Sequence, residues 1–517
     1  ASGATLDLHN VTVGAEAITL AGGTLKDVTS SLAGNITLTA DSTLVATNVG
    51  DTLTLSGVIS GSYGITKSGA GTVVLSNANT YTGATTISAG TLSVTGSLSN
   101  STAVSVASGA TYSVGNSDTI ASLTGAGSVT LGSNTLTLAN ASGTYSGVMD
   151  GSGGLTVSGG TATLSGANTY TGATAIGSGA TLALSTGGSI ADSSAVTATG
   201  TLDISGTTSG ASIKSLAGAG GVTLGAKTLT LTAANDTYSG VMSGTGGLTV
   251  SGGSQTLSGA NTYTGATTVS GGTLSLGAND VIADSSALTV SGGTFAVGTY
   301  SDTVGAVSLS SGSITGTTGV LTGSSYSVSN ATGTTTISAI LGGSGDLTKT
   351  GAGTVVLSNN NTYTGATTIS AGTLSVTGSL SDSTAVSVAS GATYNVDASD
   401  TVGSIEGAGT ISTSSIGLKT LSVGANNSTT VFSGSINNGL GSLSLVKLGT
   451  GGLTLSGTNT YTGATTISVG SLSATGTLDS NLALVVADGT TFILGRDSTI
   501  ASLTGGGNVN LGSYRLV

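Results

Sequence analysis

The sequence predicts an all-β protein, a parallel β-helix (β-solenoid) that forms an elongated rod. Short runs alternate apolar and polar side chains and end at Gly, Asn or Ser-Gly, as in TVVLS from Thr72 and TLTL from Thr135, which is typical of strands. The 517 residues contain no proline. Nearly every strand of a parallel β-helix lies between two neighbours, so nearly every backbone N–H is needed, and proline has none. The chain is also internally repetitive, which is typical of solenoids.

An array of two-sheet sandwiches would give a similar strand pattern. Such domains usually bury large aromatic side chains, and only 3% of this chain is aromatic. The narrow lumen of a β-helix is filled instead by Val, Leu, Ile, Ala and Thr, which dominate here together with Gly and Ser. At roughly 20–25 residues per coil, the chain would make roughly 20–25 coils, each adding about 4.8 Å along the axis.

Composition excludes several classes of function. The formal net charge is −12 with only nine Lys and Arg, so neither nucleic acid nor anionic lipid is an expected partner, because both need a basic face. Gly, Ser or Thr interrupts every apolar run, so we expect no direct membrane insertion. The absence of cysteine excludes a disulfide scaffold.

The repeat is defined by the motif NTYTGAT, which occurs at residues 79–85, 168–174, 261–267, 361–367 and 459–465. We therefore expect residues 1–517 to form a single continuous solenoid of five units of about 90–100 residues. Each copy is interpreted as a structured corner, with Asn and Gly shaping the turn and Tyr packing across it. The predicted corner residues are Asn79, Tyr81, Gly83, Asn168, Tyr170, Gly172, Asn261, Tyr263, Gly265, Asn361, Tyr363, Gly365, Asn459, Tyr461 and Gly463.

A family resemblance rests on the sequence around these motifs. GAGTVVLSNANTYTGATTISAGTL at 69–92 closely resembles the autotransporter-associated β-strand repeat, also called the passenger-associated transport repeat. Residues 351–374 and 449–472 match nearly as well, and the copies from Gly159 and Ser251 lose the leading Gly-x-Gly. The resemblance implies a right-handed β-helical passenger of a type V secretion system, exported through the outer membrane to the extracellular bacterial surface. It implies that the translocator barrel lies outside this sequence.

Both ends of the sequence fall inside repeats. ASGATLDL at 1–8 is similar to 107–114 and 389–396, and the last residues match the segment after Gly127. Bare solenoid ends expose unpaired strand edges. The expectation is therefore either a fragment of a longer chain or a protomer that stacks end to end.

Reactive groups are scarce. His9 is the only histidine and there is no cysteine, so a Ser-His-Asp triad, a Cys–His pair or a zinc cluster is not expected. The acids follow the repeat, as Asp is expected to do at turns. One set comprises Asp192, Asp284, Asp382 and Asp479, with Asn100 in the fifth copy, and the other Asp118, Asp302, Asp400 and Asp497. We predict no catalytic residue, no cofactor and no metal site, with weak Ca²⁺ binding at Asp-rich turns left open.

The predicted function is therefore non-enzymatic: a surface stalk or adhesin rod that presents or spaces adhesive contacts. Its possible ligands are glycans or proteins of a host or of another cell. One alternative is an extracellular filament formed by end-to-end stacking, with self-association side by side also possible. A second alternative is a β-helix that binds or cleaves polysaccharide, which would need carboxylates that break the repeat pattern.

Overall fold

The structure, a computed structural model, describes residues 3–517 and is a β-solenoid of about 27 turns. These residues form strands, turns and bends, and every recorded strand pair is parallel. The predicted fold class is confirmed, with slightly more turns than expected. Its handedness stays a prediction. Within the described residues, no helix is long and apolar enough to cross a membrane.

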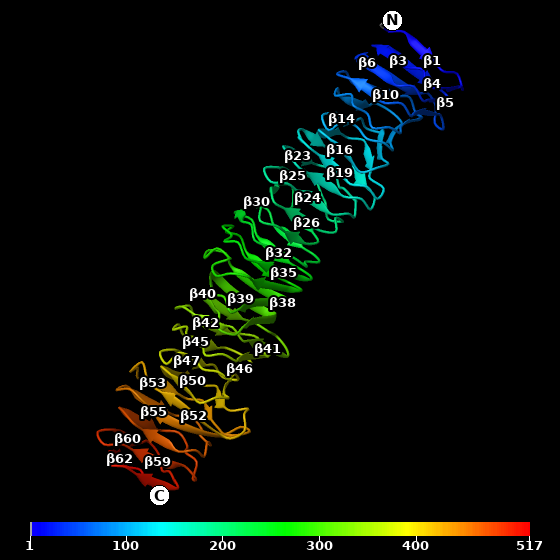
Figure 1. Cartoon of the computed structure of the whole chain (residues 1–517). Coiled ribbons are helices and arrows are strands. Elements are labelled where there is room, and N and C mark those ends of the chain that lie inside the picture. Colours follow the sequence, from blue (N-terminus) through cyan, green and yellow to red (C-terminus); the bar gives the residue numbers. More distant parts are fainter. Residues whose placement is uncertain (1–2) are drawn as a thin grey trace. The chain divides into compact units, whose positions relative to one another are not determined.

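The chain divides into two compact units, Ala1–Gly265 and Ala266–Val517. In each, the strands stack as successive rungs (Figure 1). One turn of the first unit runs from β10 (Ile65–Ser68) to β11 (Thr72–Leu75), crosses a third face without a strand at 79–83, and returns to β12 (Thr85–Ile87). β12 pairs directly with β10. Each turn therefore visits three faces.

Four sheets lie entirely within the first unit, and its remaining strands β28 (Ala211–Ile213), β31 (Leu229–Leu231), β32 (Thr237–Tyr238), β34 (Leu248–Val250) and β35 (Ser254–Leu257) belong to a further, twenty-six-stranded sheet. A three-stranded sheet contains β3 (Ile18–Ala21), β6 (Ile36–Ala40) and β9 (Ile59–Gly61). An eight-stranded sheet contains β2 (Thr12–Val13), β5 (Thr29–Leu32), β8 (Thr52–Leu55), β11, β13 (Thr91–Val94), β15 (Thr111–Val114), β18 (Ser128–Thr130) and β21 (Met149–Asp150). A thirteen-stranded sheet contains β1 (Thr5–Asp7), β4 (Thr24–Asp27), β7 (Ser42–Ala46), β10, β12, β14 (Ala103–Val106), β17 (Ser122–Gly125), β20 (Thr144–Tyr145), β23 (Thr161–Leu164), β25 (Thr181–Thr186), β27 (Thr201–Thr207), β30 (Gly221–Gly225) and β33 (Met242–Gly244). A six-stranded sheet contains β16 (Asp118–Ile120), β19 (Leu136–Leu138), β22 (Leu155–Val157), β24 (Thr174–Ile176), β26 (Val196–Ala198) and β29 (Leu216–Ala217).

The second unit repeats this plan around an irregular beginning. Two short strands, β36 (Thr267–Val269) and β37 (Thr273–Leu276), come first, and three long strands follow: β38 (Leu288–Gly298), β39 (Asp302–Gly316) and β40 (Val320–Val328). The register shifts between β38 and β39. Regular short strands follow, and one face is a six-stranded sheet of β49 (Asp400–Val402), β52 (Leu418–Val423), β55 (Ser442–Lys447), β57 (Thr465–Ile467), β59 (Ala483–Val486) and β61 (Ser502–Thr504).

The core is an aliphatic lumen. Alternate residues of each strand are buried. The register between neighbouring strands places aliphatic side chains opposite each other, as with Leu25 and Leu44. Burying each such side chain contributes roughly 1.5–3 kcal/mol. The outward positions are mostly Ser and Thr. The sequence alternation therefore sorts aliphatic side chains inward and hydroxyls outward.

Candidate functional site: the repeated corners

Each copy of the motif lies one coil after the last strand of a column of paired strands, at the position where that column would otherwise continue. Residues 79–83 cover β9, residues 168–172 cover β21 and residues 261–265 cover β33, the final strands of the three-, eight- and thirteen-stranded sheets. The Thr80, Thr169 and Thr262 N–H groups donate to the carbonyls of Ile59, Met149 and Met242, each at 2.9 Å. The motif is therefore an interruption of the ladder rather than a part of it.

The motif asparagine supplies the hydrogen bonds that a further strand would have made. Buried Asn79 accepts the Ile59 N–H of the coil before it at 3.0 Å. Its amide donates to the Asn77 carbonyl of its own coil at 2.8 Å and to the Ser97 carbonyl of the following coil at 3.1 Å. One side chain thus joins three successive coils.

The other four copies repeat the geometry. Their acceptor bonds come from the N–H groups of Met149 to Asn168, Met242 to Asn261, Leu341 to Asn361 and Ile436 to Asn459, at 2.8–3.3 Å. Their amides donate to the carbonyls of Gly166, Gly259, Asn359 and Gly457. We call this residue the coil-bridging asparagine.

The motif tyrosine points into the lumen. Tyr81 is fully buried, and its hydroxyl lies 2.6 Å from the Thr85 hydroxyl at the end of the same motif. The equivalent pairs Tyr170–Thr174, Tyr363–Thr367 and Tyr461–Thr465 lie at 2.6–2.7 Å, and Tyr263 is equally buried. Burial raises the pKa of each phenol in these four pairs, that of Tyr461 to about 12. These rings do not face solvent and cannot stack on an external ligand.

The motif glycine is required by a close approach of backbones rather than by a left-handed turn. None of the five motif glycines has a positive φ. A Cβ at Gly83 would collide with the backbone between Tyr63 and Gly64, and one at Gly172 would collide with the Gly153 carbonyl. Gly265, Gly365 and Gly463 meet the preceding coil in the same way. Two coils touch at this point, and only a residue without a side chain fits.

Successive corners lie on different faces of the solenoid. In the first unit, β12 follows the first corner and lies in the thirteen-stranded sheet, whereas β24 follows the second corner and lies in the six-stranded sheet. In the second unit, β45 (Thr367–Ile369) pairs with β43 (Leu347–Lys349), whereas β57 lies in a separate sheet. A repeat unit is therefore not a whole number of turns. Consecutive copies do not form a continuous stripe.

Three buried lysines were not found by the sequence analysis. Lys67 occupies a lumen position, stacked below Ile87, and its ammonium donates to the carbonyls of Ser68 at 3.0 Å and of Gly69 and Ala89 at 2.8 Å. Lys349 and Lys447 are held in the same way. Burial lowers the pKa of all three, that of Lys67 to about 8.

Corner length is the sequence signal for these lysines. Five positions separate Lys67 from Thr72, where the next strand begins, but only four separate Val157 from Thr161 at the equivalent corner. The longer corner turns its carbonyls toward the lumen, and a lysine is long enough to satisfy them. The shorter corner takes a valine.

The predicted acid sets separate into two environments. Asp118, Asp302 and Asp400 are buried, and each accepts a backbone N–H from the preceding coil, as Asp118 does from Leu98 at 2.9 Å. Asp497 accepts the Arg515 N–H at 2.8 Å and is exposed. In the other set, Asp192, Asp284 and Asp382 are exposed and Asp479 is half-buried. The first set bridges coils, a role that reaches further than the local turn predicted for it.

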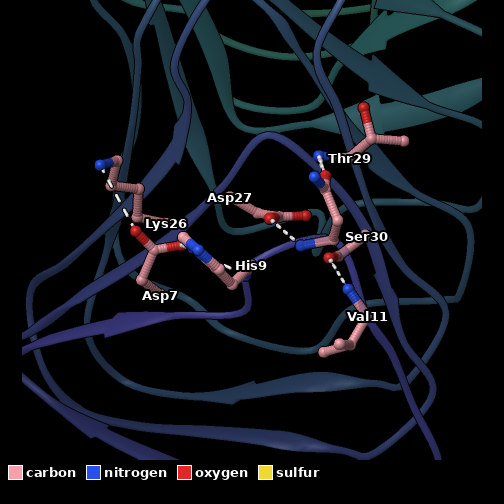
Figure 2. Close-up of polar contacts among 8 residues, drawn as sticks. Asp7, His9, Val11, Lys26, Asp27, Thr29 and Ser30 are labelled. Carbon is pink, nitrogen blue, oxygen red and sulfur yellow. Dashed lines mark hydrogen bonds and ion pairs between the residues drawn. The ribbon is translucent and has the colours of Figure 1, made fainter.

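His9 lies in an exposed turn near the start of the chain (Figure 2). Its Nδ1 is 3.9 Å from Asp7, which also lies 3.5 Å from Lys26. The hydroxyl of Ser30 accepts the Val11 N–H at 2.9 Å. Among residues 3–517, no group of three or more His, Cys, Asp or Glu side chains could hold a metal ion.

These features define a β-solenoid repeat protein whose coils are joined by side chains placed once per unit. Five segments of the chain match the passenger-associated-transport-repeat family, at residues 65–94, 159–184, 244–276, 347–376 and 445–474. The resemblance seen in the sequence is therefore confirmed. Each repeat contains one of the corners described above.

The chain is also 40% identical over 118 residues to the adhesin BmaC autotransporter of Brucella suis biovar 1 (strain 1330). The match covers 21% of this chain and 4% of that relative. The chain thus spans a small part of the relative's length. No solved structure matches the chain.

Replacing a coil-bridging asparagine should loosen three coils at once. Asn168→Ala leaves the Met149 N–H without its acceptor and removes the amide that bonds the Gly166 and Ser189 carbonyls, and a buried unpaired group costs about 1–3 kcal/mol. We expect a local loss of about 1–3 kcal/mol, measured as faster amide hydrogen exchange at residues 149 and 166–170. Asn140→Ala, at an exposed asparagine of the same unit, is the control and should leave exchange unchanged. Equal protection in both variants would contradict the bridging role.

Asp302 should make the second unit less stable as pH rises. Burial raises its pKa to about 7, and the neighbouring carboxylates Asp280 and Asp284 add to the shift. The proton is therefore held more tightly in the folded state than in the unfolded chain. The resulting stabilisation is complete below about pH 4 and is lost as pH rises through 7.

Asp302→Asn should reduce this decline, because an amide does not titrate in this pH range. The amide oxygen can still accept the N–H groups of Val281 and Ile282, so the fold is kept. The measurement is the urea midpoint between pH 4 and 8. Asp400, whose burial raises its pKa to about 6, leaves a residual slope. Asp192→Asn, at an exposed carboxylate, should keep the wild-type profile. An unchanged slope in Asp302→Asn would show that this carboxyl does not titrate as stated.

Proposed function

We propose that the chain is a non-enzymatic passenger segment of a bacterial surface adhesin, whose solenoid acts as a stalk that spaces adhesive contacts from the cell. The observation that carries the proposal is the role of the motif residues in the five repeats: the Asn and Tyr side chains bond within and between coils, and the Gly lets two coils approach closely. The repeats belong to a passenger-associated family, and a partial relative is named an adhesin. The expected location is the extracellular face of the outer membrane.

The physical basis of a stalk is the continuous backbone ladder with its aliphatic lumen. Stability of such a solenoid is approximately a sum of coil stabilities and contacts between adjacent coils. Length can therefore change by whole repeats without redesign of the fold. The Ser- and Thr-rich exterior and the net charge of −12 limit non-specific association.

Deletion of one repeat tests the spacing role. Removal of residues 80–168 joins Asn79 to Thr169 and regenerates the motif NTYTGAT. The shortened chain, coupled to beads, should keep its far-ultraviolet circular dichroism and still attach to cells. Particle length in negative-stain micrographs should fall by roughly 20 Å, the rise of between four and five coils.

A matched deletion of residues 90–168, which breaks the repeat register, should misfold locally. If beads coated with the full-length chain attach to no cell type, the adhesive part of the proposal is overturned. Release of reducing ends from polysaccharides by the purified chain would overturn the non-enzymatic part.

A further inference from the structure

Two consecutive coils of the second unit carry longer loops at the same corner. Residues 413–421 connect β51 (Thr410–Ser412) to the part of β52 that pairs with β49. The equivalent connection in the first unit is residues 131–136. In the next coil, the connection is made by residues 436–445, and the equivalent connection in the first unit is made by residues 149–155. Each loop is three residues longer. Together they form a protrusion that the first unit lacks at this corner.

The protrusion is held rigidly from below. Asp397 accepts hydrogen bonds from the hydroxyls of Ser375 at 2.6 Å and Ser414 at 2.7 Å, and from the Ser415 N–H at 3.0 Å. Burial opposes the ionisation of Asp397, but these bonds lower its pKa below the ordinary value. In the second loop, Asn438 donates to the Thr462 hydroxyl at 3.0 Å and accepts two N–H groups. Such preorganisation lowers the cost of binding a ligand.

The protrusion carries an apolar lip. Ile416, Leu418 and Leu440 are 81%, 61% and 76% exposed. Leu440 lies on the next coil beside the same loop, since its N–H donates to the Thr413 carbonyl at 3.0 Å. Aliphatic side chains this exposed have no role in the lumen.

A polar groove of about 300 Å³ lies along β52, the strand that carries Leu418. It is lined by Ser379, Asp382, Ser399, Asp400, Thr401, Thr420 and Ser422. Along β52, Leu421 and Val423 are buried, so the alternate residues Leu418, Thr420 and Ser422 share the outer face. The hydroxyl floor of the groove therefore continues directly into Leu418.

We infer that this groove binds a neutral carbohydrate, an inference that rests on the proposed adhesive function and names its ligand class. Serine and threonine hydroxyls both donate and accept hydrogen bonds, as the hydroxyls of a sugar do. Asp382 is exposed and adds an acceptor. Leu418 offers an apolar surface to the C–H face of a sugar ring.

The charge of the groove selects among sugars. Its lining contains hydroxyls and two carboxylates but no lysine, arginine or histidine. Asp400 already accepts the N–H groups of Leu380 and Thr401, so Asp382 is the carboxylate that meets the ligand. Sulfated or carboxylated glycans would be repelled by it. The same position is Asn100 in the first unit.

An array of immobilised glycans tests the inference on the complete chain. The probes are neutral glucose-, galactose- and N-acetylglucosamine-containing oligosaccharides, with sulfated and sialylated glycans beside them. At least one neutral class should bind, and the double variant Thr420→Val/Ser422→Ala should weaken that binding at least tenfold. Leu418→Ser should weaken it as well. The matched control is Thr135→Val/Thr137→Ala, which changes the equivalent outward positions of the first unit and should have no effect.

Three outcomes would overturn the inference. They are binding of no neutral glycan, preference for acidic glycans, and binding that survives the groove variants. If bead attachment to cells persists in any of these cases, the adhesive function stands and only this ligand assignment fails. If Leu418→Ser abolishes attachment to a protein-coated surface but no sugar binds, the lip is a protein-docking surface instead.

Discussion

Gly172→Ala is expected to separate two coils locally and to destabilise the first unit around the second corner. The new Cβ would lie inside contact distance of the Gly153 carbonyl and of the Gly154 nitrogen, which are backbone atoms fixed by the ladder. Overpacking of this kind costs about 1–3 kcal/mol and more where the neighbour cannot move. Amide exchange should accelerate in residues 149–157 and 168–176, and a protease should cut there.

Gly187→Ala is the matched control for this prediction. Gly187 lies in the same unit, has no positive φ, and a Cβ there would meet only the Ser165 carbonyl, at 3.7 Å. We expect wild-type exchange in this variant. If Gly172→Ala is tolerated equally well, the coils do not approach as closely at the corner as described.

Lys67→Val is expected to destabilise its corner although valine is the natural residue at two equivalent positions. The change leaves the carbonyls of Ser68, Gly69 and Ala89 without their donor. Unpaired buried carbonyls cost about 1–3 kcal/mol each, and burial of the valine side chain does not offset that. We expect a loss of about 2–4 kcal/mol, measured by local hydrogen exchange across residues 65–91.

The reciprocal variant Val157→Lys should also be destabilising, because the shorter corner of the second repeat places a charge in the lumen. A second readout is pH. The pKa of Lys67 is lowered to about 8 in the fold, so the unfolded chain binds the extra proton between about pH 8 and 10.5. Wild-type stability should therefore rise with pH across that window, and Lys67→Val should show less of this rise. If Lys67→Val is as stable as the wild type, the hydrogen bonds of Lys67 to the three carbonyls do not stabilise this corner.

Local alternation was sufficient to predict the strands, and the absence of proline with the few aromatic residues pointed to a solenoid rather than a sandwich. The runs from Thr72 and Thr135 contain β11 and β19, and alternate residues of both strands are buried, because a strand that buries one face has a period of two residues. The motif could likewise be interpreted as a corner from Asn, Tyr and Gly alone. The bonds of Asn79 to Ile59 and Ser97 could not, because these partners are about twenty residues away and are set by coil length.

The remaining features depend on register between coils. The groove beside Thr420 could not be predicted from any single segment, because its prediction requires the loop lengths of two stacked coils to be compared. Gly83 illustrates a different limit: glycine was assigned to turn shaping, but its conformation is ordinary and the constraint is the backbone of the coil beside it. The lysines were overlooked because an isolated charge in a polar string normally faces solvent.

Residue-level hydrogen exchange of the unmodified chain tests most directly whether the repeated motifs hold the coils together. The N–H groups of Ile59, Met149 and Leu341 end their sheets and are bonded only to motif asparagines across the coil boundary. We predict that they exchange as slowly as amides inside the ladders, such as those of β11 and β13. Exchange as fast as that of the exposed turn at 48–50 would show that the motifs are loosely attached, and that their side chains are available for another purpose.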